Sequence, residues 1–117
     1  MNNRLLGVFN IEDEIERFRP GDTEAGRRAE TLIKSDGLRV VLVTMLVGFA
    51  LHEHTAPGPI TIHAIRGRFV VTFEDQEREI GPGELVSLAT GVRHAVRTVE
   101  DGTFLLTIGW GPTVGKE

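Results

Sequence analysis

The stretch Gly48–Gly67, GFALHEHTAPGPITIHAIRG, decides how the rest of this chain can be interpreted, because it holds three of the four histidines. In an extended strand, side chains two residues apart point to the same face and lie about 6.5–7 Å apart along the chain. Alternation therefore predicts that His52 and His54 share one strand face, with Glu53 on the other. Two imidazoles on one face provide half of a metal site, and neutral imidazole suits zinc, iron, nickel or copper.

A second stretch, Gly83–Thr98 (GELVSLATGVRHAVRT), holds the remaining histidine, His94. His94 can supply a third imidazole from another strand, so we expect the metal ligands to be His52, His54 and His94. A His-x-His pair alone is a weak signal, since two exposed strand histidines without any ligand give the same pattern. Thr98 shares the strand face of His94, and we expect it to line the same pocket.

These two stretches resemble the two motifs of the cupin family. The positions that fit the first motif are Gly48, His52, His54 and Gly67. Those that fit the second are Gly83, Gly91 and His94. Three positions depart from the family pattern, namely Ile60 for Glu, Ala89 for Pro and Thr98 for Asn. The resemblance covers about residues 29–110 and implies a cupin β-barrel, or double-stranded jelly-roll sandwich, with a divalent transition metal (Fe, Zn, Ni, Mn or Cu) inside.

Ile60 stands where the family has a carboxylate metal ligand, and this affects the expected chemistry. A three-His site without a carboxylate keeps the full dipositive charge of its metal and attracts an anionic, chelating ligand such as a carboxylate. We expect Ile60 and Ile62 to form an apolar floor of the pocket, with His63 on the opposite strand face. Some cupin-like thiol dioxygenases use three histidines, so the missing Glu is compatible with catalysis as well as with a site that is not catalytic.

From Ala29 onward, short apolar runs alternate with turn signals every eight to twelve residues, which predicts an all-β sandwich or barrel. Turns are expected at Gly67 and at Asp101-Gly102, among others. Asn10 is expected to cap a short helix over Ile11–Phe18. We divide the chain into an N-terminal helix and arm (residues 1–28), a barrel (29–112) and a loose tail (113–117).

Composition excludes several classes of protein. With 117 residues, 40% hydrophobic and 26% charged, the chain is expected to be one soluble domain with a single core. A net charge of -4 gives no reason to expect nucleic-acid binding, and the absence of cysteine excludes disulfides and thiolate ligands. No apolar run approaches the roughly 20 residues of a membrane-spanning helix. Acidic residues near the start do not suit a signal peptide, so we expect a cytoplasmic location.

The stretch Leu38–Val47 is apolar on both strand faces, although a small sandwich has only one interior. Its second face must therefore pack on the N-terminal helix or on another subunit, and we expect a homodimer. The N-terminal part is interpreted as a flap that packs on the barrel, or alternatively as an arm swapped within a dimer.

Two classes of function stay open at this point. One is a metal-dependent enzyme that acts on a small organic acid, as a dioxygenase or isomerase. The other is a non-catalytic module that binds or senses such a molecule, and a structural role in a larger assembly is a weaker third. No carboxylate is expected in the pocket, which counts against proton-transfer chemistry.

Overall fold

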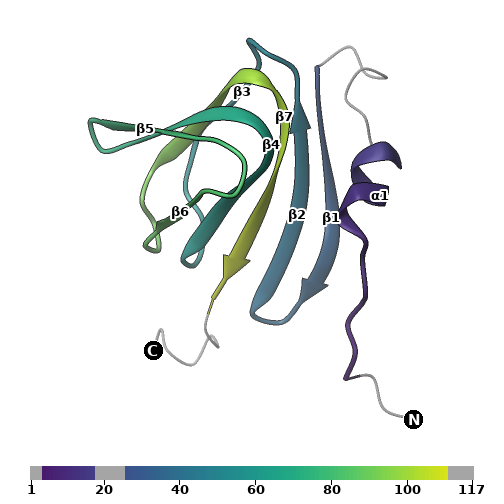
Figure 1. The fold of residues 1–117 in the computed structure, drawn as a ribbon. Coiled ribbons are helices and arrows are strands. Elements are labelled where there is room, and N and C mark those ends of the chain that lie inside the picture. The colour runs from purple at the N-terminus through teal and green to yellow at the C-terminus, as the bar shows by residue number, and fades with distance from the viewer. Residues whose placement is uncertain (1–3, 18–25, 111–117) are drawn as a thin grey trace, which may run out of the picture.

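The structure is a computed structural model that describes residues 4–17 and 26–110. Within these ranges the chain is mostly β, with one short helix, as the sequence predicts (Figure 1). The helix is α1 (Ile11–Arg17). The strands are β1 (Arg27–Ser35), β2 (Leu38–Met45), β3 (Ala50–His54), β4 (Ile60–Phe73), β5 (Gln76–Ile80), β6 (Leu85–Leu88) and β7 (His94–Gly109). The expected tail, 113–117, lies outside the described residues.

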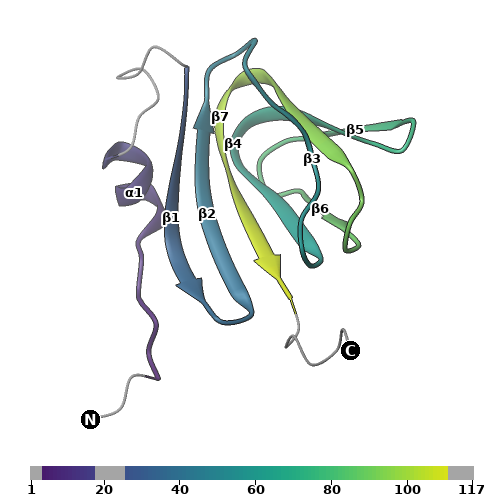
Figure 2. The ribbon, with the colours of Figure 1, turned by 180° about the vertical axis from the view of Figure 1, so that it is seen from behind.

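Two long strands, β4 and β7, connect both halves of the barrel. They pair with each other in antiparallel fashion from Ile60↔Ile108 to Phe73↔His94. The first half of β4 also pairs with β6, and its second half pairs with β5. Strands β2 and β1 extend the sheet beyond the second half of β7, and β3 pairs with the first half of β7. Figure 1 and Figure 2 show β4 and β7 curving from one half of the barrel into the other.

The two strands bend where Gly67 and Gly102 meet. A Cβ atom on Gly67 would lie 2.6 Å from the Gly102 Cα atom and 2.3 Å from the Asp101 carbonyl oxygen. Gly67 also has a φ of +74°, in the left-handed region that favours glycine. The sequence predicted chain-reversing turns at Gly67 and at Asp101-Gly102, and both predictions are wrong. The glycines instead allow continuous strands to bend sharply at a close backbone crossing.

The core lies between the two halves of the barrel. Ile60, Ile62 and Ala64 alternate inward and are at most 2% exposed, which confirms the predicted face of this strand. Deeper in the core, the Phe69 and Phe104 rings meet edge to face with centroids 5.1 Å apart, a favourable aromatic geometry.

Helix α1 packs on the outside of the sheet near β2. Asn10 caps it as predicted, because its side-chain oxygen accepts a hydrogen bond of 3.0 Å from the Asp13 backbone N–H. Ile15 is 6% exposed, and Leu42 on the outer face of β2 is 1% exposed. The helix thus covers part of the second apolar face of β2. In the ranges 4–17 and 26–110, no helix is long and apolar enough to cross a membrane.

Candidate functional site

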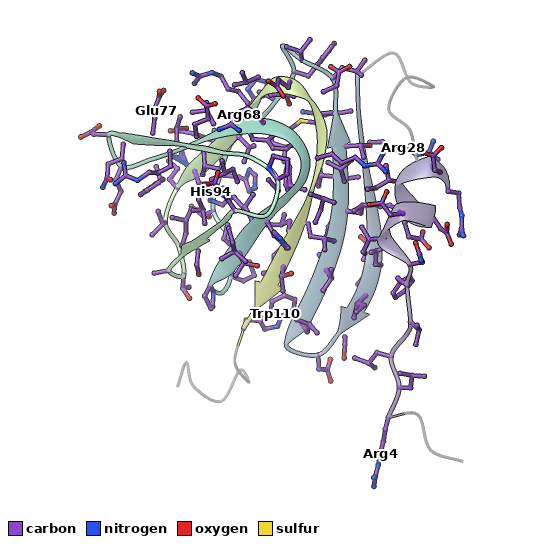
Figure 3. All side chains as sticks on the ribbon, viewed as in Figure 1. Arg4, Arg28, Arg68, Glu77, His94 and Trp110 are labelled. Carbon is purple, nitrogen blue, oxygen red and sulfur yellow. The ribbon has the colours of Figure 1, made fainter. Side chains whose placement is uncertain are left out.

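His54 and His94 lie side by side on the inner face of the barrel. His54 ends β3 and pairs directly with His94, which begins β7 and also pairs with Phe73 at the end of β4. The two imidazole rings are 4.5 Å apart between centroids, at an angle of 60°. His94 is 2% exposed and lies within the curve of the strands (Figure 3), whereas His54 is exposed. The pair therefore reaches from the interior to solvent.

Each of the two rings is held by a main-chain carbonyl group. His54 Nδ1 lies 2.8 Å from the His52 carbonyl oxygen, and His94 Nδ1 lies 3.0 Å from the Val92 carbonyl oxygen. Because a carbonyl oxygen only accepts hydrogen bonds, Nδ1 must donate in both rings. The lone pair of each neutral imidazole is then on Nε2. Histidines that ligate metals are commonly oriented in this way, by a hydrogen bond from the nitrogen that does not bind.

A β-bulge separates His52 from this pair. Leu51 pairs with Val96 and His54 pairs with His94, so three steps along β3 match only two along β7. His52 and Glu53 together stand opposite Ala95, which is the arrangement of a bulge. Since Leu51 packs against the core, alternation places His52 on the outer face. The expected shared face of His52 and His54 is therefore wrong, because the bulge interrupts the alternation between them.

On the outer face, His52 lines a groove of about 280 Å³. The other residues that line this groove are Ala50, Leu51, Glu53, Thr72, Ala95, Val96 and Arg97. Glu53, the carboxylate nearest in sequence to the histidines of β3, forms an exposed ion pair of 3.3 Å with Arg93. Among the described residues, no three His, Cys, Asp or Glu side chains are grouped so that they could hold one metal ion. The structure brings together two imidazoles without a carboxylate. Imidazole nitrogen suits divalent metals such as zinc, and two of them are part of a complete set of ligands.

The expected pocket residues lie deeper than the histidine pair. Ile60 and Ile62 are 2% and 1% exposed and belong to the hydrophobic core. Thr98 follows His94 and Val96 on the inner face of β7, and its Oγ1 atom is buried without a hydrogen-bond partner. His63 is half-buried on the opposite face of β4, as predicted. The two carbonyl groups that orient the rings could not be found from the sequence, because no side-chain pattern reveals them.

Electrostatics favours the neutral form of His94. Burial lowers the pKa of His94 below its usual value of 6.5, and the neighbouring His54 lowers it further. The hydrogen bond to the Val92 carbonyl oxygen opposes this shift but is the smaller effect. The neutral imidazole is the form that binds metal, so His94 stays competent as a ligand at lower pH than a free histidine.

Comparison with known proteins identifies the family. The cupin domain model matches residues 41–109, and the chain belongs to the cupin family. A cupin superfamily protein from Desulfitobacterium hafniense is 20% identical and has a TM-score of 0.70, over 73% of this chain and 78% of its own. A conserved protein of unknown function from Streptococcus pyogenes is 17% identical, with a TM-score of 0.75 over 96% and 94% of the two chains.

A DMSP lyase from Ruegeria pomeroyi is also similar, at 24% identity and a TM-score of 0.67, over 76% of this chain and 49% of the lyase. At these identities the similarity shows the fold alone. A search of curated protein sequences finds no match to this chain. The specific function therefore has to be argued from the site.

Proposed function

We propose that this cupin binds a divalent transition metal at the barrel opening on His54 and His94, and that the bound metal holds a small organic acid. The observation that carries the proposal is the contact of the two rings, 4.5 Å apart, with both Nδ1 atoms held by carbonyl groups. When bound, the metal would supply a Lewis acid that attracts an anionic oxygen.

His52 can join this site only if the bulge moves along β3. A bulge at Ala50-Leu51 instead of His52-Glu53 would pair His52 with Val96 and turn its side chain inward, while His54 would keep its pairing with His94. The expected three-His site and the two-His site thus differ by the position of one bulge. We propose that the His54 and His94 pair forms the core of the site, and that His52 is a third ligand only in the shifted register.

The class of ligand follows from the surroundings of the pair. Phe73 lies beside His94 in the register, and the residues behind it in the barrel are apolar. A ligand with one chelating anionic end and one apolar end suits such a site. In the described residues no carboxylate is grouped with the two histidines, so once these hold a metal no carboxylate is in place to move a proton for isomerisation. This observation favours the binding or sensing function over catalysis, with a dioxygenase as the enzymatic alternative.

Metal analysis of single histidine variants tests the site. We expect His54→Ala and His94→Ala to lower the metal content of purified protein strongly, and His63→Ala, on the opposite face of β4, to leave it unchanged. Loss of metal in His52→Ala as well would show that the bulge shifts on binding. Wild-type metal content in a His54→Ala/His94→Ala double variant would rule out the proposed site.

Calorimetry against a panel of keto and hydroxy acids tests the ligand class. We expect acids to bind the metal-loaded protein and compete with one another, with little binding to metal-free protein. An oxygen electrode run beside it separates the two functions, since only a dioxygenase in its iron form would consume oxygen when the acid is added. Equal binding of the acids with and without metal would contradict both the sensor and the dioxygenase.

We also propose that the protein is a homodimer. The support is the apolar outer face of β2: Leu42 is buried where α1 packs, whereas Val40 on the same face is only half-buried. Light scattering at micromolar concentration should give twice the monomer mass of 12.9 kDa. A monomer mass would contradict the dimer and leave the metal site unaffected.

A further inference from the structure

The two outer faces of the barrel differ in their chemistry. One face is formed by β5, the second half of β4 and the first half of β7. It carries exposed ion pairs, Arg68 with Glu79 at 2.6 Å and Arg97 with Glu77 at 3.2 Å. Charged side chains of this kind are typical of an antiparallel sheet that faces water.

The other face is formed by β6, the first half of β4 and the second half of β7. In the register, Leu85 stands beside His63, which stands beside Leu105. Away from α1, six outward-pointing residues of this face are Thr61, His63, Leu85, Ser87, Leu105 and Thr107, whereas Arg66, farther along β4, pairs with Glu12 of α1. None of these six is Lys, Arg, Asp or Glu, and we call this set the uncharged face. Helix α1 packs on the neighbouring part near Leu42, but Leu85 remains 54% exposed.

The segment before α1 has the complementary property. Residues 4–10 form an extended arm that is exposed throughout. Its large apolar side chains are Leu5, Leu6, Val8 and Phe9, with exposures of 75%, 56%, 82% and 37%. Figure 1 and Figure 2 show the arm leaving α1 and running beyond the ends of the strands, and Figure 3 shows Arg4 away from the barrel. Leu5 and Val8 are therefore too exposed to be packed on their own barrel.

We propose that this arm packs on the uncharged face of a second copy of the chain. The arm is apolar and exposed, and the uncharged face offers Leu85 and Leu105 without a charged neighbour in the set. The two surfaces belong to the same chain without covering each other. In a two-fold symmetric dimer, each arm can cover the uncharged face of the partner subunit. Both arms and both faces are then buried in one interface. The inference rests on the proposed homodimer and specifies two surfaces, besides the outer face of β2, that take part in it.

The available area is sufficient for a stable interface. From their exposures, the four apolar residues of one arm present on the order of 500 Å², so two arms with their docking surfaces would bury roughly 2,000 Å² in total, at the upper end of standard-size interfaces. Exposed apolar side chains at this density are unusual for a monomer. The area argument thus supports a second copy as the occupant.

Substitutions on each surface test the inference, with light scattering and a dilution series as the measurement. We expect the triple variant Leu5→Ser, Leu6→Ser, Val8→Ser to raise the dimer dissociation constant at least about a hundredfold, because three apolar side chains lose their burial. Leu85→Glu should do the same from the other surface. The matched control is Val47→Ser with Val99→Ser, since these residues are 57% and 39% exposed but lie on neither surface.

The outcomes separate the inference from the homodimer itself. Arm exchange is supported if the triple arm variant and Leu85→Glu are monomeric while the control variant stays dimeric. An arm variant that stays as dimeric as wild type overturns the exchange while the homodimer stands. A monomeric wild type overturns both. The arm lies outside the barrel core, so the triple variant tests the exchange even where Leu85→Glu fails to fold.

Discussion

At the scale of single residues, His94 combines a buried position with an ionisable ring. The spacing of the second motif predicts that His94 belongs to the site. Its contact with His54 depends on a bulge in β3 that could not be predicted from the sequence. The lowered pKa of His94 then follows from burial, which only the folded structure defines.

The first prediction concerns the pH dependence of stability in metal-free protein. The unfolded chain binds a proton at His94 near pH 6.5, whereas the folded chain binds it only at lower pH. As the pH falls below about 6.5, the free energy of unfolding should therefore decrease, by about 1.4 kcal/mol for each unit of pKa difference. Urea unfolding between pH 7.5 and pH 5 measures this. A His94→Gln variant should lose this part of the slope, and an unchanged slope would contradict the prediction.

The second prediction compares two glycines that share a positive φ. Gly67 has φ +74° and a carbonyl oxygen 2.3 Å from where a Cβ atom would be, whereas Gly83 has φ +88° and nothing within 4 Å. Gly83→Ala should cost about 1–2 kcal/mol for its backbone conformation alone. Gly67→Ala should cost clearly more, because the backbones of β4 and β7 must separate. Chemical denaturation of both variants checks this, and equal losses would show that the crossing is not tight.

At the scale of elements, the hairpin between β4 and β5 uses an unusual turn. Phe73 pairs with Gln76, and the two residues between them, Glu74 and Asp75, have φ values of 50° and 58°. Two positive φ angles define the turn type that favours Asn-Gly, and non-glycine residues adopt it at a cost. The polar residues predict a hairpin turn at Asp75-Gln76-Glu77, but the structure turns one residue earlier, at Glu74-Asp75, and Gln76 and Glu77 belong to β5. The turn type was not predicted, since Glu74 is not typical of it.

The third prediction follows from this turn. Replacing Glu74-Asp75 by Asn-Gly should raise the free energy of unfolding by about 1 kcal/mol, because Asn and Gly adopt the two positive φ angles at lower cost. The thermal midpoint should rise accordingly. The single change Pro82→Asn creates an Asn-Gly pair in another loop, because Gly83 already follows, and as a control it should bring no such gain. A fall in stability of the hairpin variant would contradict the assigned turn.

The bulge in β3 marks the limit of sequence-based prediction for the site. Strict alternation described β4 correctly from Ile60 to Ala64, because each inward side chain is buried and the pattern shows it. In β3 the residues near the opening are exposed on both faces, so no hydrophobic pattern reports where the extra residue lies. The pairing of His54 with His94 is set by contacts with β7 and not by local sequence.

At the scale of the whole molecule, the fold class was predictable because short apolar runs and glycine-containing breaks are distributed along the entire barrel region. What the sequence could not give is the continuity of the long strands. Gly67 and Gly102 resemble turn residues when taken alone. In the structure, β4 and β7 run through these glycines without a break. The Gly102 Cα atom lies 2.6 Å from where a Cβ atom on Gly67 would be, so the bend needs glycine.

The continuity of β4 and β7 has a consequence for amide hydrogen exchange. Neither half of the barrel can open without breaking the ladder that the two strands share, so the amides at Val71 and Phe104 should exchange only through global unfolding. The end of β3 at His54 pairs with a single strand and should exchange through local opening, with a lower protection factor. NMR can measure amide exchange while denaturant is added in steps. The opening free energies of Val71 and Phe104 should then fall along the same line as the free energy of global unfolding. If Val71 and Phe104 differ widely in opening free energy, the two halves of the barrel behave as separate cooperative units.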